Sequence, residues 1–231
     1  MNTEPTPTEY AQVLNATINE LHPLSQRTGL PASMQYQYVG TIVDNTITLL
    51  IGVANALDGG HRTIEFSDFT NWRSTMKAVH RSFYSTLIAA VEQGLQEFCA
   101  QEGIDIKPAP QRREEQIAKL EEWGEKPLPA RIKKLIPAPQ LGLMDYARAV
   151  IKQKLPTTEQ PTWTRFFDGL RILRNKASHA NPTLTSAEII CLETGGLGAM
   201  LVSGEFRLWP EHYREVVELV LRFFDEVVAI S

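Results

Sequence analysis

The sequence predicts a mainly α-helical protein, a helical bundle with one small β-hairpin near residues 188–208. Apolar side chains recur three or four residues apart over most of the chain, which is the period of an amphipathic helix. Breaker clusters of glycine, proline and asparagine separate these periodic segments. Only residues 188–208 depart from the pattern, because there apolar residues surround glycine pairs and a Ser-Gly turn, which is typical of a hairpin.

The first half of the chain predicts three helices. The first covers residues 9–22 and is expected to end before Pro23. The second covers residues 33–57, where an Asp-Gly-Gly run follows. The third, over about residues 68–100, has the clearest pattern, since its apolar stripe continues for about eight turns opposite a polar face.

The second half begins with a segment of different composition. Residues 107–140 hold six prolines that flank one short charged helix, predicted over 111–123. Helices are then predicted over about 141–154 and 161–179. After the hairpin, a last helix covers 210–229, starting with a proline in the first turn, where proline is tolerated.

The elements divide one elaborated domain into four parts. They are an N-terminal tail with helices (1–66), a core helix (67–106), a Pro-flanked charged insertion (107–140) and a helical core with the hairpin and the C-terminal helix (141–231). A chain of 231 residues can bury a core without disulfides or bound metals.

Cysteine usage and hydropathy indicate a cytoplasmic location. Cys99 and Cys191 lack any neighbour at metal-ligand spacing and are predicted to be free, buried thiols, which fits a reducing compartment. The N-terminus lacks the basic and apolar regions of a signal peptide. The most apolar stretch, residues 48–57, is too short to cross a bilayer, so no membrane partner is expected.

Charge is distributed unevenly along the chain. The net charge is −4, but residues 107–179 hold 15 basic and 8 acidic side chains, a net of +7, against −11 elsewhere. Such asymmetry points to a localised site for an anion or a nucleic acid. A solvated charged insertion would produce the same asymmetry.

Most enzyme signatures are absent from the sequence. It contains no Walker loop, nucleophile elbow, HExxH motif, Cys/His zinc set or dinucleotide fingerprint. The Gly195-Gly196-Leu197-Gly198 run is predicted to be a turn, because no helix with a basic residue follows it. Neither a metal nor an organic cofactor is therefore expected.

One helix end concentrates polar chemistry. Arg171, Arg174 and Ser178 are three and four residues apart and share a helix face, and His179 lies in the last turn. An arginine and a histidine that titrates near neutral pH can together hold a phosphate and move a proton. From spacing alone, a surface helix end with basic residues and an exposed histidine explains the segment as well.

The string Arg174-Asn175-Lys176-Ala177-Ser178-His179 resembles the motif of the HEPN superfamily, the higher eukaryote and prokaryote nucleotide-binding domains. That motif is an arginine, a polar residue and then a histidine after four to six intervening residues. The setting is similar too, because HEPN domains are small helical bundles with the motif towards the end of a core helix. Residues 1–60 and 107–140 have no obvious counterpart in the family.

The resemblance implies a metal-independent endoribonuclease, such as a toxin or a defence effector. His179 would act as acid or base on the ribose 2′-OH, Arg174 would stabilise the phosphorane and Asn175 would orient the arginine or the phosphate. The resemblance further implies a homodimer with paired motifs, and an antitoxin or regulatory protein as a partner. The secondary candidates for RNA contact are Arg171, Lys176 and Ser178; solvation explains them equally.

Two other interpretations stay open. The chain can be a catalytically silent HEPN-like module that binds nucleic acid, nucleotide or a protein, or an unrelated helical scaffold with a coincidental motif. Trp123 on the charged insertion can stack a base, but docking of the insertion on the core is the favoured interpretation. His80 lies in an apolar stripe and is expected to be a hydrogen-bonded packing histidine.

Overall fold

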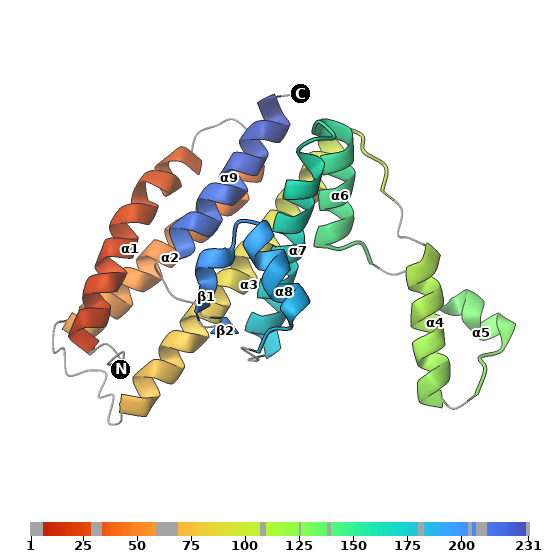
Figure 1. Ribbon diagram of the computed structural model, residues 1–231, viewed down its shortest axis with the longest axis horizontal. Coiled ribbons are helices and arrows are strands. Elements are labelled where there is room, and N and C mark those ends of the chain that lie inside the picture. The colour runs from red at the N-terminus through yellow and green to blue at the C-terminus, as the bar shows by residue number, and fades with distance from the viewer. Residues whose placement is uncertain are drawn as a thin grey trace.

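A computed structural model describes residues 7–28, 34–58, 69–106, 110–124, 126–137, 140–179, 183–202, 205–206 and 212–229. These residues form a helical bundle, which confirms the predicted mainly α-helical class (Figure 1). The longest helix, α3 (Phe69–Gln101), runs through its middle and contacts helices on two sides. Its neighbours are α2 (Met34–Asp58), α6 (Leu143–Lys154) and α7 (Gln160–His179).

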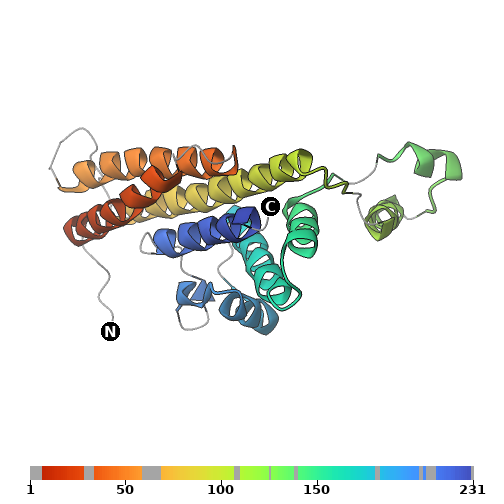
Figure 2. The same cartoon turned by 90° about the horizontal axis from the view of Figure 1, so that it is seen from above.

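The helices form two layers. Seen from above, α2, α3 and the first helix, α1 (Pro7–Thr28), lie together, and the C-terminal helix α9 (Tyr213–Ala229) lies below them with α6 and α7 (Figure 2). Helix α9 contacts α1, α2 and α6. Segments from both ends of the chain therefore build one core.

Aromatic side chains fill the space between α7 and α9. Phe223 is fully buried, and its ring centroid lies 4.7 Å from that of Phe167 and 5.1 Å from that of Trp163. The pairs meet edge to face, the arrangement that aromatic quadrupoles favour. This packing places one face of α7 in the core and leaves the opposite face for the candidate site.

The first helix is longer than the sequence predicts. It continues through Pro23 to Thr28 instead of ending before the proline. Proline has no N–H to donate to the carbonyl of Asn19, which weakens the helix at that turn. Leu21 and Leu24 on either side of the proline are both buried, so tertiary packing outweighs the local cost.

The Pro-flanked insertion contains two helices where the sequence predicts one. Helix α4 (Pro110–Gly124) matches the predicted 111–123, whereas α5 (Ala130–Leu135) is unexpected. Both stand apart from the bundle in the two views (Figures 1 and 2). The exposed fraction of Trp123 is 80%, so the expected docking of this residue on the core is wrong.

The predicted hairpin over 188–208 is wrong in its first part. Residues 186–194 form helix α8 (Ser186–Thr194) because Thr185 caps it: its hydroxyl accepts from the Glu188 N–H, and the Glu188 carboxylate accepts from the Thr185 N–H at 2.7 Å. A 3-10 turn, η1 (Gly198–Met200), follows. Strand β1 (Leu201–Val202) then pairs antiparallel with β2 (Glu205–Phe206), and the Ser-Gly turn between them lies outside the described residues.

Candidate functional site

Helix α7 presents the predicted site residues on its outer side. Leu170, Leu173 and Ala177 are buried in the core, whereas Arg174 and Asn175 are exposed. This division follows from the helical period, which puts residues three or four apart on one face. The polar positions of the motif are therefore directed away from the core by the same pattern that builds the core.

Arg174 forms an ion pair with a helix far away in sequence. Its Nη1 donates to Glu92 Oε2 of α3 at 2.8 Å, and the two side chains are 47% and 24% exposed. Tyr146 of α6 lies in the same region. The pKa of its hydroxyl is raised, first by burial and then by the charges of Cys99, Glu92 and Asp145. Spacing along the chain does not indicate Glu92 as a partner, because 82 residues separate it from Arg174.

Arg171 and Asn175 line a shallow pocket against α8, whereas the partner of Arg174 is on α3. Asp168 Oδ1 lies 3.5 Å from Arg171 Nε and 3.9 Å from Arg148 Nη2 of α6, so one carboxylate lies between two exposed guanidinium groups. The lining comprises Asp168, Arg171, Ile172, Asn175, Ala187, Glu188 and Cys191. The pocket thus combines two of the predicted site residues with two acidic neighbours, Asp168 and Glu188, that no sequence pattern indicates.

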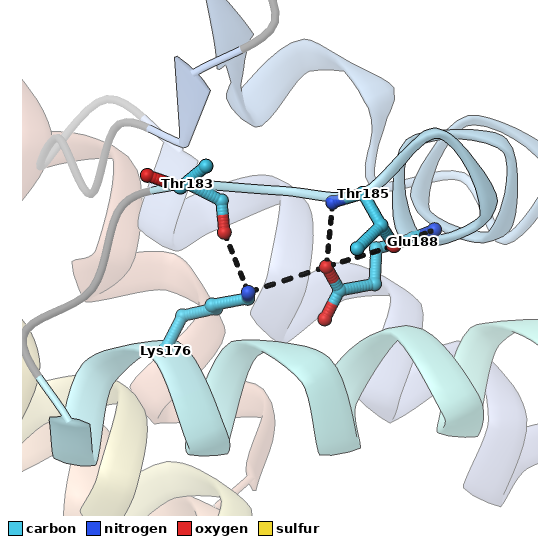
Figure 3. A network of polar contacts seen from close by, with 4 residues as sticks. All are labelled: Lys176, Thr183, Thr185 and Glu188. Atoms are coloured by element: carbon cyan, nitrogen blue, oxygen red, sulfur yellow. Dashed lines mark hydrogen bonds and ion pairs between the residues drawn. The ribbon is translucent and has the colours of Figure 1, made fainter.

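Lys176 holds the beginning of α8 against α7 (Figure 3). Its ammonium donates to the carbonyl of Thr183 at 2.5 Å and pairs with Glu188 at 3.2 Å, and its side chain is only 15% exposed. The pKa of the Glu188 carboxyl is lowered by the Thr185 N–H first and by Lys176 as a further donor. Lys176 therefore has a structural role in addition to the RNA contact predicted for it.

His179 is the last residue of α7, as the sequence predicts. The side chains of His179 and Ser178 lie outside the described part of the structure. The predicted pairing of Arg174 with His179 therefore stays a prediction. Of the six candidate residues, four have described side chains, and these face two neighbouring elements: α3 for Arg174, and α8 for Arg171, Asn175 and Lys176.

A second polar cluster is buried inside the bundle. His80 is 3% exposed, and its two ring nitrogens form hydrogen bonds with the hydroxyls of Tyr10 from α1 and Tyr213 from α9. A neutral imidazole has one donor and one acceptor, so one tyrosine donates and the other accepts. Burial lowers the pKa of His80 to about 3, which confirms the expected hydrogen-bonded packing histidine.

Both described cysteines are free and Cys99 is buried, as predicted, but Cys191 is partly exposed, so its predicted burial is wrong. Burial raises the pKa of the Cys99 thiol to about 11, which makes it a poor nucleophile. Within the described ranges, no group of three or more His, Cys, Asp or Glu side chains could hold a metal ion. The helices described here are also not long and apolar enough to cross a membrane.

The chain matches no protein-family model, no curated protein and no solved structure. Its resemblance to HEPN domains accordingly rests on residues 174–179 and on their setting in a helical bundle.

Proposed function

We propose that this protein is a HEPN-like, metal-independent endoribonuclease that acts as a homodimer with paired motifs. His179 transfers a proton to or from the ribose 2′-OH, and Arg174 stabilises the charge on the phosphorane, while Asn175 orients the arginine or the phosphate. The 2′-oxygen attacks the phosphorus, the 5′-oxygen of the next nucleotide leaves with a proton, and a 2′,3′-cyclic phosphate results. A toxin or defence effector, restrained by an antitoxin or regulatory protein, would have this activity.

The observation that carries the proposal is the state of Arg174. Its side chain is 47% exposed near the end of a core helix, and its Nη1 donates to Glu92 Oε2 at 2.8 Å. A guanidinium has five N–H donors, so a phosphate can bind while the ion pair with Glu92 fixes the plane of the group. An arginine held in this way loses less side-chain entropy when it binds an anion.

Two further arginines near α7 support an anionic ligand. Arg148 of α6 and Arg171 of α7 are exposed, with side chains 60% and 52% accessible, and both lie near Asp168. A single carboxylate between two arginines leaves the group with a net positive charge. Phosphate contacts by such cations position a nucleic acid without reading its sequence.

The second candidate function is a silent HEPN-like module that binds nucleic acid, nucleotide or a protein. The ion pair of Arg174 with Glu92 also favours this function, because it can serve only to hold α7 against α3, which requires no catalysis. The two functions differ in one observable: a silent module binds RNA or nucleotide and leaves it intact.

The test compares RNA cleavage by the wild type with cleavage by Arg174→Ala and His179→Ala, in the presence of a metal chelator. Arg214→Ala is the matched control, since Arg214 is 48% exposed and pairs with Glu218 at 2.8 Å on α9. We expect a loss of about 100-fold or more in both motif variants and wild-type activity in the control. Equal cleavage by all four proteins, or cleavage by none of them over several RNAs, would contradict the enzymatic proposal. RNA binding without cleavage would support the silent module.

A further inference from the structure

The α4–α5 arm, residues 110–136, extends away from the bundle (Figures 1 and 2). Glu121 joins its two helices: its carboxylate pairs with Lys133 at 2.7 Å and accepts from the Leu128 N–H at 2.8 Å. No residue of α5 is buried. A helical hairpin of this size does not build a core by itself.

The arm exposes large apolar side chains at helical spacing. On α4, Leu120 and Trp123 are three residues apart and are 37% and 80% exposed. On α5, Ile132 and Leu135 are also three residues apart and are 38% and 74% exposed. Each helix therefore has an uncovered apolar face, which is unusual for a monomer and typical of a protein–protein contact. An exposed tryptophan is the residue type that most often anchors such contacts.

The charges of the arm are self-complementary. Helix α4 begins with Arg112 and Arg113, and its following residues 114–124 hold four glutamates against one lysine, whereas residues 126–136 hold four basic residues and no acidic one. Within the arm, Glu121 and Lys133 already pair with each other. The remaining glutamates of α4 and the basic residues around α5 can pair with a second arm if α4 of one arm lies beside α5 of the other. A two-fold axis produces that arrangement, since each helix then faces the other helix of the partner.

We propose that the arm is a dimerisation surface and that its occupant is the arm of a second copy of this chain. The apolar faces pack at the centre, and α4 of each copy lies against α5 of the other, with glutamates opposite lysines and arginines. The two arms together make a four-helix bundle. The inference does not rest on the proposed ribonuclease activity, and it shares with the proposed function only the homodimer, whose contact it assigns to the arm.

The first test removes the apolar anchors. Sedimentation equilibrium compares the wild type with Trp123→Glu/Leu135→Glu and with the control Leu49→Glu/Ile51→Glu, which changes exposed apolar residues of α2 (47% and 44% exposed). We expect a dimeric wild type and control, and dimerisation at least about 100-fold weaker in the arm variant. Circular dichroism should show the same helical content in all three. A monomeric wild type, or a dimer that the arm variant leaves intact, overturns the proposal.

The second test reverses the charges. One variant carries Glu114→Lys, Glu115→Lys and Glu122→Lys, and the other carries Lys126→Glu, Arg131→Glu and Lys134→Glu. Each is expected to be monomeric alone because like charges then face each other, and an equimolar mixture is expected to form a heterodimer because both contacts become attractive. A mixture that stays monomeric overturns the two-fold arrangement. The difference in acrylamide quenching between the wild type and Trp123→Phe reports the exposure of Trp123, one of four tryptophans. A monomeric wild type with a shielded Trp123 would show that the arm packs on the bundle of its own chain and would overturn the proposal.

Discussion

Acidification should destabilise the bundle through His80, the buried histidine between Tyr10 and Tyr213. Burial lowers its pKa from 6.5 to about 3, so the folded state stays unprotonated at a pH at which the unfolded chain binds a proton. Stability is therefore complete above pH 6.5 and is lost as the pH falls towards 3. Over that window the loss is about 1.4 kcal/mol per pH unit, or about 3 kcal/mol between pH 7.5 and pH 4.5.

The assay is urea unfolding at pH 7.5, 6.5, 5.5 and 4.5, with free energies of unfolding extrapolated to water. His80→Gln removes the titrating group and keeps an amide in the same place, and His22→Gln, at an exposed position of α1, is the matched control. We expect His80→Gln to be less stable at pH 7.5 but to lose about 3 kcal/mol less than the wild type on acidification, because other groups titrate equally in both. Equal pH dependence in the wild type and His80→Gln would refute this account of the buried cluster.

Two further predictions concern stability. Gly52→Ala in α2 should stabilise the protein by about 0.5–1 kcal/mol, because an added Cβ meets nothing within 4 Å. Gly195→Ala should destabilise it by about 1–3 kcal/mol, because the added Cβ would lie 2.8 Å from the backbone oxygen of Arg165. Thermal unfolding of both variants checks these opposite signs. Lys176→Met should lower the free energy of unfolding in urea by about 1 kcal/mol, since it removes the contacts with Thr183 and Glu188. An unchanged midpoint would contradict the structural role of Lys176.

Helical periodicity was sufficient to predict most of the bundle, because the helices are stabilised mainly by burying one face. The pattern of Phe83, Leu87, Val91, Leu95 and Phe98 matches a row of buried positions along α3. The structure differs from the predicted elements where a local sequence signal competes with tertiary packing, and where a capping box begins a helix in the predicted hairpin. The helix-breaking tendency of Pro23 was overridden by buried neighbours, and the Thr185–Glu188 capping box, which marks the start of α8, was readable in the sequence.

The candidate site was less accessible to sequence reasoning. Spacing along α7 was enough to expect that Arg171 and Arg174 would be directed outward, and both are exposed. Spacing contains no information about partners from other helices, so Glu92 and the Tyr10–His80 hydrogen bond depend on how distant segments meet. The exposed face of the α4–α5 arm has the same origin, because composition alone does not distinguish an insertion that docks on the core from one that stands apart.

The most direct test of the proposed ribonuclease is the chemistry of the RNA ends that it produces. Purified wild-type protein is incubated with end-labelled RNA in excess chelator, and the 3′ ends of the products are analysed beside those from His179→Ala. The account predicts 2′,3′-cyclic phosphate ends with the wild type and a rate lower by about 100-fold or more with the variant. Intact RNA with the wild type, or the same ends at the same rate from His179→Ala, would contradict it.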